Sequence, residues 1–111
     1  MRLSTIQEAA SARALRRGTI IDVRNADEFA AGHAPGAMFM PLPTVPLRLA
    51  DLDRRESYFV VCDSGARSFQ ACSYLAQHGY DVRNVHGGMS AWRAAGLSTE
   101  SGTFDFAGSH S

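Results

Sequence analysis

The chain has 111 residues, enough for one domain, and its hydrophobic content of 45% can fill a core without disulfides. Eleven Lys and Arg residues balance eleven Asp and Glu residues, which argues against nucleic-acid or membrane-surface partners, because both require a basic excess. No apolar run is long enough to span a bilayer, the N-terminus lacks the apolar block of a signal peptide, and two cysteines in such a chain indicate a reducing compartment such as the cytoplasm.

Helix and strand signals alternate along the chain, which predicts an α/β domain with a largely parallel sheet. The first helix begins at a capping box, formed either by Ser4 with Gln7 or by Thr5 with Glu8. Gly18 is the residue expected to end it.

A β-branched strand follows at residues 19–23. A second capping box, Asn25 with Glu28, opens a short helix, and the Pro-Gly turn at residues 33–37 leads to a short strand at 38–40. Glu28 is therefore interpreted as a capping residue rather than an acid catalyst.

The second half of the chain contains the central strand. Prolines are expected to break residues 41–46, although residues 47–52 can form a helical turn or two. Residues 58–62 are apolar throughout, as in a strand covered on both faces. The last strand is predicted at 82–85. A last helix is predicted at 90–95, and Trp92 is expected to anchor it as a core residue.

A helix is predicted over residues 67–78. Its apolar face is expected to hold Phe69, Cys72, Leu75 and Ala76. Cys72 is thus predicted to be a core residue rather than a resolving thiol for Cys62. Residues 98–111 form a polar tail that is expected to be flexible, and Phe104 and Phe106 in it are frayed or dock on a partner.

Cys62 lies where the central strand ends and the next helix begins. Ligands bind at this edge of an α/β sheet, and a helix N-terminus favours negative charge. These effects, with Arg67 nearby, stabilise a thiolate nucleophile. The residues around it fit a buried strand cysteine equally well.

Four blocks of sequence, one of which contains this loop, bear on the choice between a catalytic cysteine and a buried strand cysteine. They read IDVR with EF at residues 21–24 and 28–29, GHAPGA at 32–37, CDSGARS at 62–68, and VHGGMSAW at 85–92. In order and spacing they resemble a single-domain rhodanese, a sulfurtransferase, over about residues 4–97. The resemblance implies a three-layer sandwich in residues 1–97, with a mainly parallel sheet of about five strands and helices on both faces.

The resemblance also implies a chemistry. Cys62 would be the catalytic residue and would carry sulfane sulfur as a persulfide, taken from a donor such as thiosulfate and passed to cyanide or a thiol. Neither a metal nor an organic cofactor is implied, and the four histidines are too scattered for a metal site. The loop that would bind substrate consists of Asp63, Ser64, Gly65, Ala66, Arg67 and Ser68.

Other residues are expected to support the loop. The family pattern suggests that Asp22 and Arg24 form a buried polar network, although both could touch substrate. His33 is expected to be a hydrogen-bonded structural residue, although the fold could bring it or His86 near the site. Gly87 and Gly88 are expected to let the chain pass close to the loop. Arg67 could hold an anionic donor or brace the loop.

Asp63 departs from the basic or neutral residue that many active members carry after the cysteine. A carboxylate that pointed inward would oppose thiolate formation and repel thiosulfate. The physiological donor would then be a protein persulfide or a less charged thiol compound. If Asp63 points to solvent, its charge is screened instead.

The loop length excludes two relatives of the family. Four residues separate Cys62 from Arg67, whereas the cell-cycle dual-specificity phosphatases of this fold have five and can hold a phosphate. The mercaptopyruvate-using branch carries a different loop. An alternative of another class is a non-catalytic rhodanese-like module that binds a protein, against which the complete loop argues.

Overall fold

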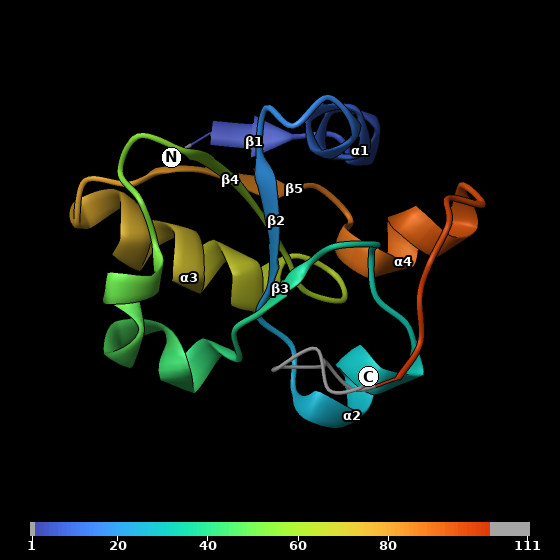
Figure 1. Cartoon of the computed structure of the whole chain (residues 1–111). Helices are drawn as coiled ribbons and strands as arrows, with labels where there is room; N and C mark the ends of the chain where they lie inside the picture. The colour runs from blue at the N-terminus through green and yellow to red at the C-terminus, as the bar shows by residue number, and fades with distance from the viewer. Residues whose placement is uncertain (1, 103–111) are drawn as a thin grey trace, which may run out of the picture.

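A single parallel sheet organises the chain, whose computed structural model describes residues 2–102. The sheet has the strand order β1-β5-β4-β2-β3 (Figure 1). Its strands are β1 (Arg2–Ser4), β2 (Thr19–Asp22), β3 (Met38–Phe39), β4 (Ser57–Val61) and β5 (Asp81–Val85). All four neighbouring pairs are parallel, so the predicted class and the five-stranded sheet are confirmed.

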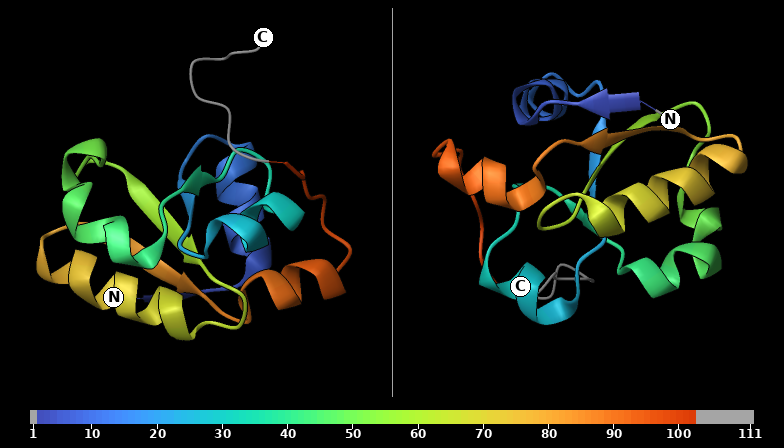
Figure 2. Two further views of the ribbon diagram at one scale, coloured as in Figure 1. Left: turned by 90° about the horizontal axis from the view of Figure 1, so that it is seen from below. Right: turned by 180° about the vertical axis from the view of Figure 1, so that it is seen from behind.

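Helices cover both faces of the sheet. One face carries α1 (Ile6–Ala14) and α4 (Gly88–Ala94), and the other carries α3 (Ala66–Gln77) with the 3₁₀ helices η1 (Leu42–Leu47) and η2 (Leu49–Asp51) (Figures 1 and 2). The short helix α2 (Ala26–Ala31) follows β2 and lies beyond the carboxyl end of that strand.

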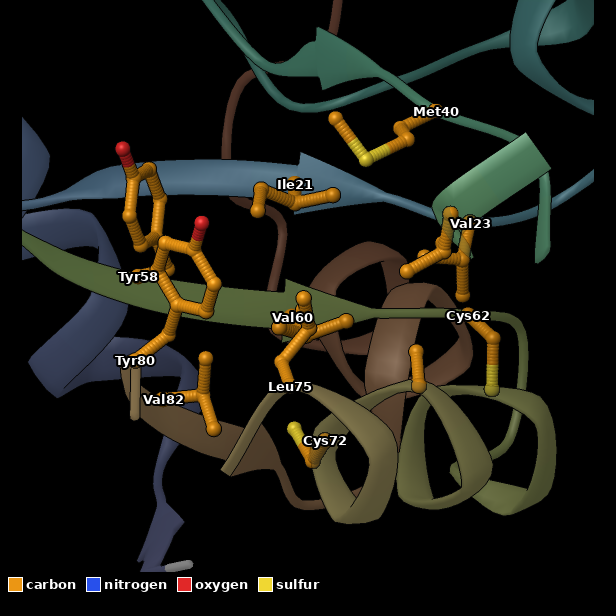
Figure 3. Close-up of a cluster of buried hydrophobic side chains, with 12 residues drawn as sticks. Ile21, Val23, Met40, Tyr58, Val60, Cys62, Cys72, Leu75, Tyr80 and Val82 are labelled. Atoms are coloured by element: carbon orange, nitrogen blue, oxygen red, sulfur yellow. The ribbon is translucent and has the colours of Figure 1, made fainter. Parts of the chain in front are cut away.

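The central strand shows why this sandwich is stable. Successive side chains of a strand point to opposite faces. Tyr58 and Val60 join the core beneath α3, together with Cys62 (Figure 3). Phe59 and Val61 join the core beneath α1 and α4. Both faces are buried, which explains the continuous apolar run in the sequence.

The first strand, β1, was not predicted from the sequence. It pairs with β5 at the edge of the sheet, Ser4 opposite Val85, and the backbone N–H of His86 donates to the Ser4 carbonyl at 2.8 Å. Only Ser4 of its three residues is buried, and Leu3 is 70% exposed. A strand this short and this exposed leaves no hydrophobic alternation to detect.

The first helix is capped by Thr5 and Glu8, which satisfy each other's backbone N–H groups at 3.0 and 2.8 Å. The helix ends earlier than predicted, because Arg16 rather than Gly18 takes the left-handed conformation, with φ +58°. The N–H of Arg17 then closes the last turn on the carbonyl of Ala12 at 2.7 Å.

The proline-rich segment is helical, contrary to expectation. In η1 the Thr44 N–H donates to the Pro41 carbonyl at 2.8 Å, and the Arg48 N–H donates to the Val45 carbonyl at 3.1 Å. The N–H groups that Pro43 and Pro46 lack are not among these closing donors, so the prolines are tolerated.

The predicted buried face of α3 was partly wrong. The residues it buries are Ser68, Ala71, Cys72 and Leu75, which confirms Cys72 as a core residue. Phe69 is 52% exposed. Ser68 is the buried residue in the first turn of α3, next to the Cys62 loop. A hydrophobicity pattern does not predict the burial of a serine.

The segment after α4 folds back on α2 as far as the structure describes it. The Trp92 indole N–H donates to the Ser98 carbonyl at 2.8 Å, and His33 and Glu100 exchange two backbone hydrogen bonds of 2.8 Å each. Phe104 and Phe106 lie outside the described residues. Within residues 2–102, no helix is long and apolar enough to cross a membrane.

Candidate active site

Cys62 follows β4 directly and lies at the mouth of α3, as the sequence predicted. Its side chain is 1% exposed, and the Gly65 N–H donates to its Sγ at 3.0 Å. Gly65 immediately precedes α3 with φ +123°, a conformation that residues with a Cβ rarely adopt. The glycine thus allows the chain to turn its amide onto the sulfur.

The surroundings of the sulfur favour its ionised form. Burial alone would raise the pKa of the Cys62 thiol, and it is the largest single influence. The Ser68 hydroxyl, 3.3 Å from Sγ, and the amides of Ser68, Gly65 and Ser64 together outweigh it and hold the pKa below its ordinary value. The thiolate, rather than the thiol, is the nucleophilic form of a cysteine.

The carbonyl groups of Cys62 and Asp63 face α4. The N–H groups of Met89 and Ser90 donate to the carbonyls of Cys62 and Asp63 at 2.8 and 3.0 Å. Gly88 is the first residue of α4, so the helix starts two residues earlier than expected. A Cβ at Gly88 would overlap the Cys62 carbonyl oxygen and lie 2.9 Å from that of Asp63.

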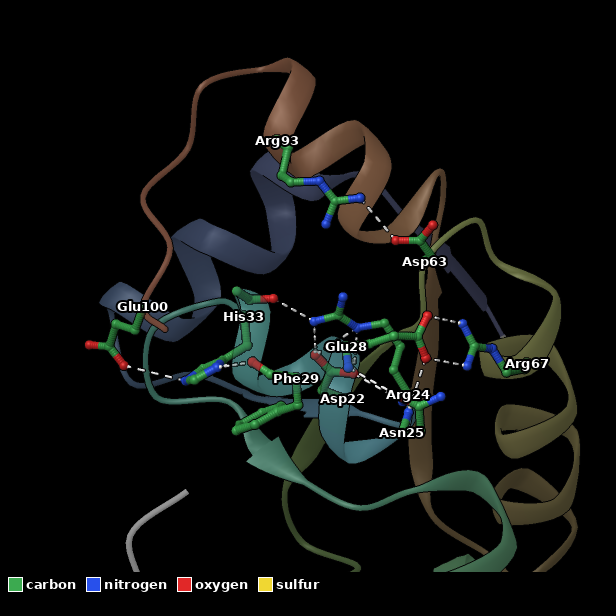
Figure 4. Close-up of polar contacts among 11 residues, drawn as sticks. Asp22, Arg24, Asn25, Glu28, Phe29, His33, Asp63, Arg67, Arg93 and Glu100 are labelled. Atoms are coloured by element: carbon green, nitrogen blue, oxygen red, sulfur yellow. Dashed lines mark hydrogen bonds and ion pairs between the residues drawn. The ribbon is translucent and has the colours of Figure 1, made fainter. Parts of the chain in front are cut away.

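Arg67 is bound to a carboxylate rather than left open. Its two terminal nitrogens donate to the two carboxylate oxygens of Glu28 at 2.7 and 2.8 Å (Figure 4). These hydrogen bonds lower the pKa of Glu28 to about 2, and Glu28 raises the pKa of Arg67. Arg67 therefore joins the loop to α2, where Glu28 also caps the Asn25 N–H at 3.1 Å.

Asp63 points away from Cys62 and toward α4. Its carboxylate accepts from the Arg93 guanidinium at 2.9 Å, and the two side chains are 43% and 49% exposed (Figure 4). Arg93 was not predicted as a site residue, because a basic residue in the last turn of a helix is common on electrostatic grounds alone.

Asp22 and Arg24 form a buried ion pair beside the loop. The Arg24 Nε and Nη2 donate to the Asp22 carboxylate at 3.0 and 2.9 Å, and Nη2 also donates to the Gly32 carbonyl at 2.6 Å. These contacts tie the end of β2 to the end of α2. The structural role expected for both residues is consistent with this geometry.

The two histidines considered for the site lie apart from the loop contacts. His33 Nδ1 is 2.8 Å from the Phe29 carbonyl oxygen, its ring stacks on Phe29 at 3.7 Å, and Nε2 is 3.8 Å from Glu100. His86 is exposed. In residues 2–102, none of the hydrogen bonds or ion pairs of either histidine reaches the Cys62 loop.

Cys72 differs from Cys62 in its surroundings. It is completely buried, and burial raises its pKa to about 12. Both cysteines are free. A thiol that stays protonated in an apolar core is inert.

An open cavity of about 430 Å³ lies beside the loop, and its lining includes Arg24, Glu28, Gly32, Asp63 and Arg93. Two arginines and two acidic residues thus line the same space. The described part of the chain holds no cluster of three or more His, Cys, Asp or Glu side chains that could bind a metal.

Comparisons with known proteins agree with this architecture. The family model of the rhodanese-like domain matches residues 5–95. A sulfurtransferase of Allochromatium vinosum is 40% identical over 79 residues, which cover 70% of this chain and 74% of that protein. The thiosulfate sulfurtransferase GlpE of Pseudomonas putida is 37% identical over 91 residues, covering 79% and 81%. The crystal structure of a rhodanese-like domain protein from Staphylococcus aureus superimposes with a TM-score of 0.81 at 36% identity, covering 91% and 100%.

Proposed function

Because the chain belongs to the rhodanese-like domain family and its relatives are sulfurtransferases, we propose that it transfers sulfane sulfur through a persulfide on Cys62. Sulfur transfer in general follows from the family. The persulfide, the donor and the acceptor are the proposal, and the thiolate-stabilising environment of Cys62 is the observation that carries it.

In the first step the Cys62 thiolate attacks the outer sulfur of thiosulfate. A bond forms between Sγ and that sulfur, the sulfur–sulfur bond of thiosulfate breaks, and sulfite leaves with the electron pair. The product is an anionic persulfide. The Gly65 amide and the Ser68 hydroxyl that now contact Sγ are donors suited to such a charge.

In the second step an acceptor attacks the terminal sulfur of the persulfide. Cyanide forms a carbon–sulfur bond and leaves as thiocyanate, or a thiolate forms a sulfur–sulfur bond and leaves as a new persulfide. In both cases the bond to Sγ breaks, and Cys62 returns as a thiolate. No general base is required in either step, because both nucleophiles are already anionic.

The charged side chains next to the Cys62 loop bear on the choice of donor. Arg24, Arg67 and Arg93 are each paired with a carboxylate, so little net positive charge is available there to attract an anion. A protein persulfide or a small thiol persulfide is therefore proposed alongside thiosulfate. The thiols of Cys62 and Cys72 are both free, which suits the cytoplasm as the proposed location.

Intact-protein mass spectrometry after incubation with thiosulfate tests the proposal. The reduced protein should gain one sulfur atom, about 32 Da, and lose it again with cyanide. Cys62→Ser should abolish the gain, and Cys72→Ser should retain it because Cys72 lies in the core.

A donor control completes the test. If thiosulfate adds no sulfur, the same incubation with a neutral or protein persulfide separates an unsuitable donor from an inactive cysteine. A gain from that donor supports Cys62 as the carrier and excludes thiosulfate. Persulfide formation on Cys62→Ser, or no gain from any donor, would refute the proposal.

A further inference from the structure

Asn84 makes a buried contact with the hydroxyl that faces the Cys62 sulfur. It lies on β5 and is 7% exposed, and its Oδ1 is 2.5 Å from the Oγ of the fully buried Ser68. Its Nδ2 donates to the Gly65 carbonyl at 3.3 Å. Neither the strand pattern nor the loop pattern of the sequence pointed to this residue.

The Ser68 hydroxyl has one proton and three acceptors within reach. They are Asn84 Oδ1 at 2.5 Å, the Gly65 carbonyl at 3.1 Å and Cys62 Sγ at 3.3 Å. The Gly65 carbonyl already receives the Phe69 N–H at 3.0 Å and the Asn84 amide, which occupies both of its lone pairs. The competition for the proton is therefore between Asn84 and Cys62.

The neighbours of the Asn84 amide determine its direction. With Nδ2 toward Gly65, the amide nitrogen donates to the Gly65 carbonyl and the amide oxygen accepts from the Ser68 hydroxyl. Turned over, it would place its oxygen against the Gly65 carbonyl oxygen, two acceptors without a proton between them. Asn84 thus acts on Ser68 as an acceptor.

We propose that Asn84 is a positioning residue that controls the ionisation of Cys62 by competing with its sulfur for the Ser68 hydroxyl proton. While Cys62 is a thiol, the hydroxyl donates to Asn84. When the thiol loses its proton to solvent, the hydroxyl turns to the thiolate and the bond to Asn84 is lost. The proposal rests on the proposed function only in taking Cys62 as the nucleophile.

Other charged groups around Cys62 are already paired, so they form a constant background. They are Arg67 with Glu28, Asp63 with Arg93, and Asp22 with Arg24. The Cys72 thiol is buried and stays protonated, so it adds no charge. Substitutions at Asn84 leave all of these contacts in place. A change in Cys62 ionisation can then be assigned to the hydroxyl.

The rate of alkylation of Cys62 by iodoacetamide against pH measures this ionisation, with peptide mass spectrometry to separate Cys62 from Cys72. In Asn84→Leu the hydroxyl is free to donate to the thiolate, which as a charged acceptor is preferred over a carbonyl. The midpoint should fall by about one pH unit, a tenfold change in the thiolate-to-thiol ratio at a given pH. In Asn84→Asp a stronger acceptor retains the proton, and the midpoint should rise.

The Ser68→Ala background is the matched control. Without the hydroxyl, Asn84→Leu should no longer move the midpoint. A rise in Asn84→Leu, or an equal fall in both backgrounds, would overturn the proposal. Asn84→Ala carries the same expected sign if the leucine variant does not fold. Because alkylation needs no sulfur donor, its outcome is independent of persulfide formation, and each proposal can fail alone.

Discussion

The carboxylate of Asp63 was expected either to oppose thiolate formation and repel anionic donors or to be screened by solvent, and its position in the structure decides how its charge acts. Directly after Cys62 in sequence, its carboxylate suggested repulsion of anionic donors. In the structure it is bound to Arg93 at the surface. The pair carries no net charge, so it should have little effect on a charged substrate. If one partner is replaced, the charge of the other is uncompensated and should act on the substrate.

Asp63→Asn should lower the KM for thiosulfate by a few fold at low ionic strength, because it leaves the Arg93 charge uncompensated. Arg93→Gln should raise the KM similarly. Both effects should disappear at about 1 M salt, where the screening length is about 3 Å. Steady-state kinetics measures them, and the double variant, which restores neutrality, is the control. An unchanged KM in both single variants at low salt would exclude an electrostatic role for Asp63.

At the scale of elements, the docking of α4 on the Cys62 loop determines the direction of the loop's peptide groups. The first N–H groups of α4 bind the loop carbonyls, while Gly65 turns its N–H onto the sulfur. A helix N-terminus needs acceptors, and here the loop supplies them. The close approach at Gly88 makes this arrangement possible.

Gly88→Ala should therefore disrupt both stability and reactivity. Its φ of +52° is unfavourable for alanine, and the added Cβ would overlap the Cys62 carbonyl oxygen. We expect the free energy of unfolding, measured with urea, to fall by more than about 2 kcal/mol and the Cys62 alkylation rate to fall with it.

Gly96→Ala is the matched control. Its φ is +73°, but no atom lies within 4 Å of the added Cβ. The free energy of unfolding should fall by only about 1 kcal/mol, the cost of alanine in a left-handed backbone conformation, and the Cys62 alkylation rate should be unchanged. Equal losses in the two variants would show that contact with the loop is unimportant.

For the molecule as a whole, the Arg67–Glu28 pair joins α3 to α2 across the carboxyl edge of the sheet. Glu28 has a pKa of about 2 in the folded protein and an ordinary value of 4.5. A carboxylate whose pKa falls on folding stabilises the protein above its ordinary pKa, and this contribution is lost as the pH falls toward the folded value.

The difference in unfolding free energy between the protein and Glu28→Gln should therefore be constant above about pH 5 and shrink between 4.5 and about 2. Both side chains are about a third exposed, so we expect a difference on the order of 1 kcal/mol after solvent screening. Glutamine retains an oxygen that can cap the Asn25 N–H, so the comparison isolates the effect of the negative charge. Urea titrations at several pH values measure the difference, and one that did not vary with pH would contradict the assignment.

Much of the fold was predictable because its signals are local. The Asn25 capping box, the β-branched second strand and the apolar fourth strand each depend on residues a few positions apart, and the structure contains all three. The placement of Cys62 between strand and helix follows from the same short-range patterns. The edge strand β1 was missed because it is short and exposed, and the helical proline segment was missed because 3₁₀ bonding leaves little periodicity.

The sequence by itself determined the α/β class, the order of the elements other than β1 and η1, and the loop that carries Cys62. Only the tertiary structure decided what the loop residues bind. Arg67 meets Glu28 across 39 residues of chain, Asp63 meets Arg93 across 30, and Ser68 meets Asn84 across 16. Backbone periodicity and capping act over one or two turns, whereas these partners become neighbours only when parallel strands bring their carboxyl ends to one edge of the sheet.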